Sequence, residues 1–163
     1  MTISEEPGRA IVRMFPDYGD TVLWFAGLPV DYEVAGLTEA LVRSLKDWEQ
    51  SYYDSLTRNL EWKSAELAGK YAAEGVRLAQ LLADELGEAY QVEFKYFEHQ
   101  AQVRRFRGGV AANVKAAAAF DALAVAQRLK DDEIARGKAS EQTGDTGWSA
   151  YSPQSGKAFK PPR

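Results

Sequence analysis

Between residues 10 and 98, the spacing of apolar residues changes from that of a strand to that of a helix and back again. Residues 10–15 and 21–25 are rich in β-branched and aromatic side chains, which favours two short strands. The four residues 17–20 between them have the composition of a tight turn, so the pair predicts a β-hairpin. Residues 90–96 alternate apolar and polar side chains and predict a third strand with one covered face. These signals restrict the chain to a fold that mixes strands and helices.

Two segments between these strands have the period of an amphipathic helix. Residues 37–56 carry one apolar face, and residues 64–86 carry a stripe of small and apolar side chains. Ser64 is a predicted N-cap, and Gly87 is expected to end the second helix in the left-handed conformation. The apolar face of the first helix consists of Leu37, Leu41, Leu45, Trp48, Tyr52 and Leu56. We therefore expect an α+β body over residues 10–99, in which two helices cover a small antiparallel or mixed three-stranded sheet (β-β-α-α-β).

The chain changes character after residue 99. Residues 100–109 are basic and end in two glycines, which predicts a linker. Residues 110–137 are rich in alanine and predict a helix. Residues 1–9 and 138–163 have the composition of disordered segments. The expected apolar face of the Ala-rich helix consists of Val114, Ala118, Ala122, Val125 and Leu129, with Phe120 and Leu123 beside it.

The charge of the chain also changes sign after residue 99. Residues 10–99 contain eight basic and 16 acidic side chains, whereas residues 100–163 contain 11 basic and six acidic ones. An acidic body joined to a basic arm indicates binding partners rather than a fold. The chain has no cysteine, which excludes disulfides and zinc–thiolate sites and is typical of a reducing compartment. The first residues lack the pattern of a signal peptide, so we expect a cytoplasmic protein.

The sequence also resembles a group of small uncharacterised actinobacterial α/β proteins, over about residues 11–97. This resemblance implies a fold and no particular chemistry, and the segment from residue 100 to 163 lies outside it. It is carried by Val12-Arg13, Asp17-Tyr18-Gly19, Leu23-Trp24, Leu28-Pro29, Leu41, Leu45, Trp48, Tyr52, Glu74-Gly75, Leu78-Ala79, Glu85-Leu86-Gly87, Val92 and Phe94.

No group of residues predicts a reaction. His99 is the sole histidine and lacks the partners of a catalytic triad or a zinc site. Asp17 and Asp20 could bind Mg²⁺ together with Glu93, but turn chemistry alone explains both aspartates. Glycine-rich phosphate-binding motifs are absent from the sequence. We therefore expect a protein that is not an enzyme and that uses no cofactor and no metal.

Three tryptophans have structural interpretations. Trp24 lies on a predicted strand and Trp48 lies on the apolar helix face, so both are expected in the core. Trp62 falls between the two predicted helices, and the sequence leaves open whether it is buried or exposed.

Two clusters are candidate binding residues. Arg104, Arg105 and Arg107 could pair with phosphates while Phe106 stacks on a base, which would suit nucleic acid. The second cluster is a docking peptide of aromatic anchors and cations in the tail; its alternative is that the tail folds back on its own body. It comprises Trp148, Tyr151, Lys157, Phe159, Lys160 and Arg163.

These features favour a non-catalytic protein-binding module. The first hypothesis is a structural or assembly component, such as a virion subunit, whose arm docks on another protein or on a second copy. The alternatives are an immunity or antitoxin-like protein, for which a basic toxin would suit the acidic body, and a nucleic-acid accessory protein. A carboxylate-dependent hydrolase is least favoured, because nothing supplies a nucleophile or a general base.

Overall fold

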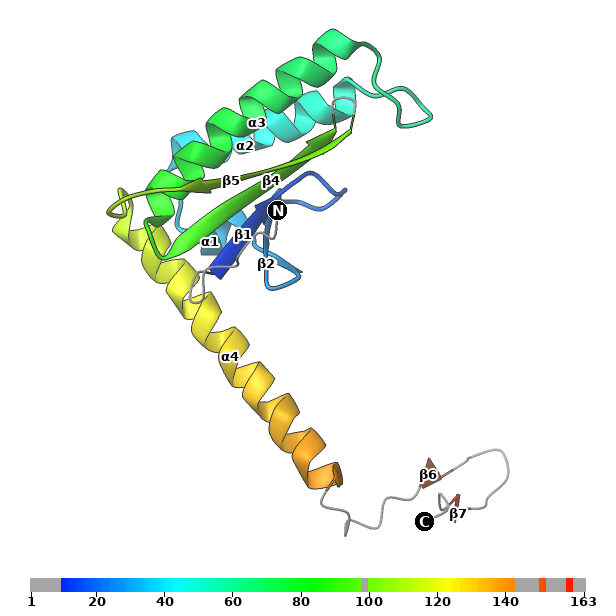
Figure 1. Ribbon diagram of the computed structural model, residues 1–163, viewed down its shortest axis with the longest axis vertical. Coiled ribbons are helices and arrows are strands. Elements are labelled where there is room, and N and C mark those ends of the chain that lie inside the picture. The colour runs from blue at the N-terminus through cyan, green and yellow to red at the C-terminus, as the bar shows by residue number, and fades with distance from the viewer. Residues whose placement is uncertain (1–9, 98–99, 143–149, 152–157, 160–163) are drawn as a thin grey trace. The chain divides into compact units, whose positions relative to one another are not determined.

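The computed structural model of the protein describes residues 10–97, 100–142, 150–151 and 158–159 (Figure 1). The chain divides into two compact units, Met1–Ala124 and Val125–Arg163. The first unit contains a five-stranded sheet and the helices that pack on it, and the proposals below rest on residues of this unit.

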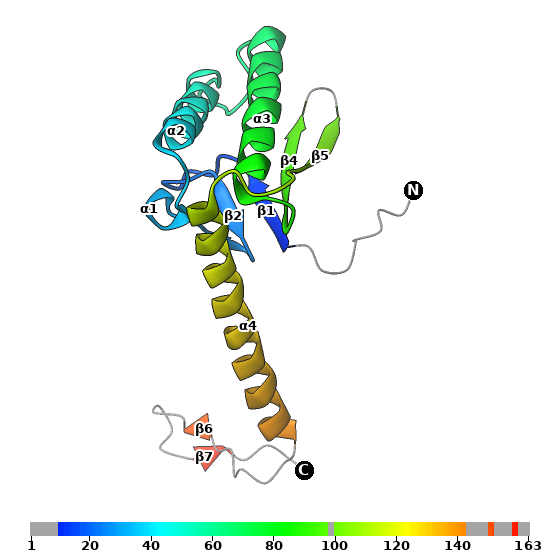
Figure 2. The same cartoon turned by 90° about the vertical axis from the view of Figure 1, so that its left-hand side faces the viewer.

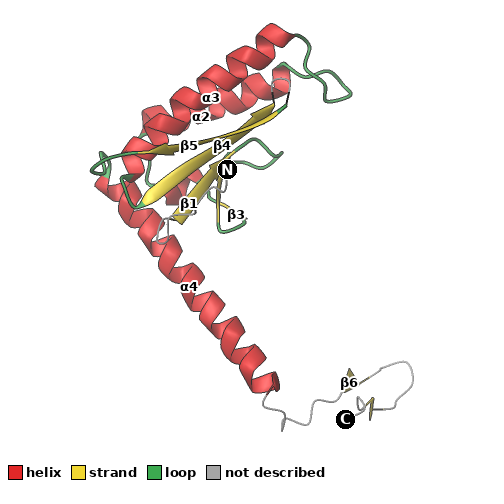
Figure 3. Ribbon diagram, in the orientation of Figure 1, coloured by secondary structure: helices red, strands yellow, loops and turns green. Residues whose placement is uncertain are grey.

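The sheet of the first unit has the strand order β3-β2-β1-β4-β5 (Figure 3). The parallel pair β1 and β4 lies at its centre, and all other neighbours are antiparallel. Its strands are β1 (Ala10–Met14), β2 (Leu23–Phe25), β3 (Leu28–Pro29), β4 (Tyr90–Phe97) and β5 (Ala101–Arg107). The parallel pair requires a crossover, which the helices between the two strands provide.

The helices are α1 (Tyr32–Ala35), α2 (Glu39–Asp54), α3 (Ala65–Leu86) and α4 (Val114–Gln142). Helices α2 and α3 lie side by side over one face of the sheet (Figure 2). The Ser64 side chain accepts a hydrogen bond from the backbone N–H of Leu67, which confirms the predicted N-cap. Gly87 does end α3 with a positive φ of 86°, but its ψ of −175° is extended rather than left-handed helical. In the second unit, β6 (Ala150–Tyr151) pairs antiparallel with β7 (Ala158–Phe159).

The α+β class is confirmed, and the three predicted strands correspond to β1, β2 and β4. The sheet is larger than predicted because β3 and β5 were missed. Residues 100–109 are not a linker over most of their length, since β5 pairs with β4 from Ala101 to Arg107. The charge of this segment hid its strand pattern: only Phe106 turns to the covered face with little exposure, while Arg104 and Arg107 stay exposed.

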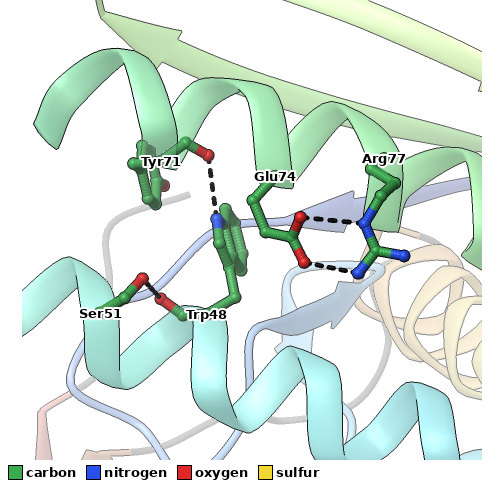
Figure 4. A network of polar contacts seen from close by, with 5 residues as sticks. All are labelled: Trp48, Ser51, Tyr71, Glu74 and Arg77. Atoms are coloured by element: carbon green, nitrogen blue, oxygen red, sulfur yellow. Dashed lines mark hydrogen bonds and ion pairs between the residues drawn. The ribbon is translucent and has the colours of Figure 1, made fainter. Parts of the chain in front are cut away.

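The core lies between the sheet and the α2–α3 layer. Trp48 of α2 is 2% exposed and stacks on Tyr71 of α3, with 4.8 Å between ring centroids. Its Nε1 donates a hydrogen bond of 3.0 Å to the Tyr71 carbonyl (Figure 4). The predicted core positions of Trp48, Val92 and Phe94 are thus confirmed.

A glycine makes this close packing possible. A Cβ built on Gly75 of α3 would lie 2.9 Å from the Trp48 ring and closer still to the Phe94 ring. A small residue in the predicted stripe therefore allows α3 to approach its neighbours closely at this position.

Helix α4 packs through a different face from the predicted one. Ala116 and Phe120 are fully buried, whereas Val114 is 76% exposed and Leu129 is 59% exposed. The Phe120 ring lies 5.9 Å from the Phe25 ring and 5.8 Å from the Tyr90 ring, edge-on to both. One large aromatic side chain buries more area than a row of alanines, so Phe120 sets the orientation of this part of the helix. Asn113 caps α4 by accepting a hydrogen bond from the Ala116 N–H.

Candidate functional site

The predicted nucleic-acid cluster does not form one surface. Phe106 is 6% exposed and belongs to the core, so it cannot stack on a base. Arg104 and Arg105 alternate across β5, because successive side chains of a strand point to opposite faces. The Nε of Arg105 donates to Glu93 Oε2 at 3.2 Å, and the Arg104 guanidinium lies 5.3 Å from the Phe106 ring.

Most of the predicted docking peptide lies outside the described residues, as does His99. This applies to Trp148, Lys157, Lys160 and Arg163. Tyr151 and Phe159 fall in β6 and β7, for which the structure describes the backbone. The docking role of the tail therefore stays a prediction.

A different surface stands out on the acidic body, where the loop between β1 and β2 meets the outer side of α2. We call it the acidic–tyrosine surface: Asp17, Tyr18, Asp20, Glu49 and Tyr53. Tyr18 is 70% exposed, and its ring lies 5.0 Å from the ring of Tyr53. Its backbone N–H donates a hydrogen bond of 2.7 Å to the Tyr53 hydroxyl.

The loop is held in an uncommon backbone conformation at Tyr18. Its φ is +48°, a region that residues other than glycine adopt rarely. The hydrogen bond to Tyr53 and the contact between the two rings fix this conformation. Such local strain concentrates at functional sites, and here it presents an aromatic side chain to solvent between two aspartates.

Glu49 is the least satisfied side chain of this surface. Its Oε2 is inaccessible to solvent and has no hydrogen-bond partner among the described residues. Burial raises the pKa of Glu49, and the negative charge of Asp20 raises it further. A carboxylate oxygen in this state would be stabilised by a cation from outside the chain.

The sequence interpretation missed Glu49 and Tyr53. Both lie on α2, beside the core residues Trp48 and Tyr52, and nothing in the helix period distinguishes them from other polar positions. The turn residues Asp17 and Asp20 were noticed, but as turn formers. They become part of an acidic surface only because the loop folds onto α2, more than thirty residues away in the sequence.

The magnesium hypothesis gains no support from these positions. Glu93 lies on the open face of the sheet, where it forms ion pairs with Arg13 and Arg105. Within the ranges that the structure describes, no three acidic, histidine or cysteine residues gather in a way that could hold a metal ion. Trp62 is half-buried and packs against Tyr52, with 5.6 Å between ring centroids, so it belongs to the edge of the core.

The helices of the described residues include none that is both long and apolar enough to span a membrane.

A family model described as "Serratia CdiI immunity protein-like" matches residues 10–97, more than half of the 163-residue chain. The chain belongs to this family. The matched range runs from β1 to the end of β4 and contains the whole acidic–tyrosine surface, whereas β5, α4 and the tail lie beyond it. No curated protein sequence matches the chain significantly.

Membership of the CdiI immunity protein-like family decides between the hypotheses from the sequence. It supports a binding role with a protein partner, and it favours the immunity alternative over the assembly component that came first. It gives no support to a virion subunit or to nucleic-acid binding. The matched range agrees with the extent of the resemblance found in the sequence, although nothing bears on the actinobacterial group itself.

Proposed function

We propose that this protein is an immunity protein that binds a protein toxin and blocks it by contact, without catalysing a reaction. The observation that carries the proposal is the family match over residues 10–97. The net charge of the same region agrees with it, since 15 acidic side chains against eight basic ones suit a basic toxin.

The acidic–tyrosine surface is the proposed contact with the toxin. Tyrosines are enriched at the centres of protein interfaces, because they bury a large rigid area and keep a polar end. Tyr18 is exposed and fixed in position by Tyr53, so its docking costs little conformational entropy. The carboxylates of Asp17 and Asp20 flank it and would draw a basic surface toward the ring.

Glu49 gives this contact its specificity. A lysine or arginine of the toxin would supply the donor that Glu49 Oε2 lacks within the described part of the chain, once the Glu49 side chain turns outward to meet it. A buried charge-assisted hydrogen bond of this kind is stronger than a neutral one, and it is lost when either partner is removed.

A protection assay tests the proposal. The protein is co-expressed with the candidate toxin domain encoded by the gene next to its own, and growth is followed after toxin induction. We expect normal growth with the wild-type chain and growth arrest when Asp17→Asn, Asp20→Asn and Glu49→Gln are combined. Arrest of growth despite a soluble wild-type chain would contradict the proposal.

A matched control removes the same charge elsewhere. Asp131→Asn, Asp132→Asn and Glu133→Gln neutralise three exposed carboxylates on α4, outside the family match. This variant should protect as well as the wild type. Equal loss of protection in both variants would show that net charge alone matters, and would exclude the acidic–tyrosine surface as the contact.

A further inference from the structure

A cavity of about 470 Å³ opens at the carboxyl ends of the central strands β1 and β4. It exists because β1 ends at Met14, opposite Phe94, while β4 continues to Phe97. Pro16 lies two residues after Met14 and cannot donate a ladder hydrogen bond, so the space beside the end of β4 is not filled by a strand. A cavity of this size accommodates a small molecule.

Aromatic rings form most of its wall. They come from the end of β1, from α2, from the segment before α3, from α3 and from β4: Phe15, Tyr52, Trp62, Tyr71 and Tyr96. Three of them support one another, since the Tyr52, Trp62 and Tyr71 ring centroids lie 5.1 to 5.6 Å apart. This mutual packing fixes the wall before any ligand arrives, which lowers the entropic cost of binding.

The rings provide apolar surface rather than charge. Burial raises the pKa of Tyr71, and burial likewise raises that of Tyr52. Both phenols therefore stay neutral at physiological pH. Among the described residues, the charged side chains of the wall are Arg13, Glu93 and Lys95.

Glu93 is already neutralised. Its side chain is 15% exposed, with Oε1 paired to the Nε of Arg13 and Oε2 paired to the Nε of Arg105, each at 3.2 Å. The bond from Arg13 uses Nε alone, so both terminal nitrogens of that guanidinium remain for a ligand. The Arg13 side chain is 50% exposed.

The balance of these charges selects the ligand. Aromatic cages often bind cations through the faces of their rings. Here a cation would meet the Arg13 guanidinium, and Glu93 would not compensate because two arginines already hold it. An anionic group would instead gain the Arg13 guanidinium, which binds planar carboxylates well.

We propose that this cavity binds a small aromatic carboxylate, whose ring packs against Tyr52, Trp62 and Tyr71 while its carboxylate pairs with Arg13. The site uses residues that the acidic–tyrosine surface does not include, so the proposal holds whether or not the protein neutralises a toxin.

The test is a calorimetric titration of the full chain with three probes: 2-naphthoate, the neutral 2-naphthamide, and choline as a cation. We expect 2-naphthoate to bind with a Kd of about 1 mM or tighter, from the usual free energy per atom of small ligands. The amide should bind at least about tenfold more weakly, since it lacks the charge that strengthens the pair with Arg13. Choline should give no measurable heat.

Variants locate the site. Arg13→Gln should reduce 2-naphthoate binding to the level of the amide, and Arg13→Lys should retain part of the preference for the acid. Arg43→Gln removes an exposed arginine of α2 that does not line this cavity, and should leave both affinities unchanged. Unchanged amide binding in Arg13→Gln shows that the cavity is intact.

Four results would overturn the proposal: equal binding of acid and amide, stronger binding of choline, no effect of Arg13→Gln on 2-naphthoate, or no binding of any probe.

Discussion

The two sides of helix α2 differ in how completely their polar groups are satisfied. On the inner side, Trp48 is 2% exposed, and its one polar atom donates to the Tyr71 carbonyl. On the outer side, the very next residue, Glu49, has an inaccessible carboxylate oxygen that accepts no hydrogen bond from a described residue. Burial of the inner side stabilises the fold. On the outer side, the inaccessible and unpaired Glu49 oxygen destabilises it, and folding alone does not explain this cost.

This difference separates two kinds of substitution. Changes on the inner side should lower the free energy of unfolding and affect binding only through the loss of folded protein. Changes on the outer side should preserve or raise stability while removing the proposed interaction with a toxin.

Trp48→Ala should lower the free energy of unfolding by about 3–5 kcal/mol, the usual cost of removing a large buried aromatic side chain. The hydrogen bond to Tyr71 is lost with the ring. Urea denaturation followed by circular dichroism measures the effect. Trp62→Ala is the comparison, and it should cost less because Trp62 is only half-buried. A cost under about 1 kcal/mol for Trp48→Ala would place the inner side of α2 outside the core.

Gly75→Ala should destabilise by about 1–3 kcal/mol, because the new methyl group collides with the Trp48 and Phe94 rings. Gly69→Ala is a matched control on the same helix, where an added Cβ meets nothing within 4 Å. That variant should be stabilised by up to about 1 kcal/mol, the difference in helix propensity. Thermal unfolding compares the two. Similar shifts of the melting temperature in both would show that α3 does not press against the core at Gly75.

Glu49→Gln should make the protein more stable at neutral pH. In the folded state the pKa of Glu49 is raised, first by burial and then by Asp20, so the folded chain holds this proton more tightly than the unfolded chain. Stability contributed by the protonated group is therefore lost as pH rises through the raised pKa. Glutamine resembles the protonated acid and avoids this loss.

The two chains should be equally stable near pH 4 and diverge toward pH 7, which urea denaturation at a series of pH values measures. A glutamine variant less stable than the wild type at pH 7 would mean that Glu49 has a stabilising partner in the free protein.

The inner side of α2 was predictable and the outer side was not. The three- and four-residue spacing of Leu41, Leu45 and Trp48 identifies the buried face directly, since helix period and burial coincide. No periodic sequence pattern marks the contact of Glu49 and Tyr53 with the β1–β2 loop. It depends on where that loop folds in three dimensions, and a binding surface needs no sequence regularity.

The predictions for β5 and for the buried face of α4 were wrong for a related reason. The three arginines of β5 predict a linker, although its single buried side chain, Phe106, is enough to anchor the strand in the core. In α4, the row of small apolar residues suggested the wrong face, because Phe120 outweighs it in buried area. In both cases one large buried side chain determines how the segment packs. The average composition of the segment does not reveal it.

The proposed contact with a toxin is tested most directly by the affinity between the full-length protein and a candidate toxin domain. The combined Asp17→Asn, Asp20→Asn and Glu49→Gln variant should raise the Kd at least about 100-fold, because truncating one partner of a buried charge pair costs about 2–5 kcal/mol. The α4 control with Asp131→Asn, Asp132→Asn and Glu133→Gln should bind within about twofold of the wild type, as rim charges contribute little. An unchanged Kd in the first variant, or equal weakening in both, would contradict the proposal that the acidic–tyrosine surface is where this protein contacts a toxin.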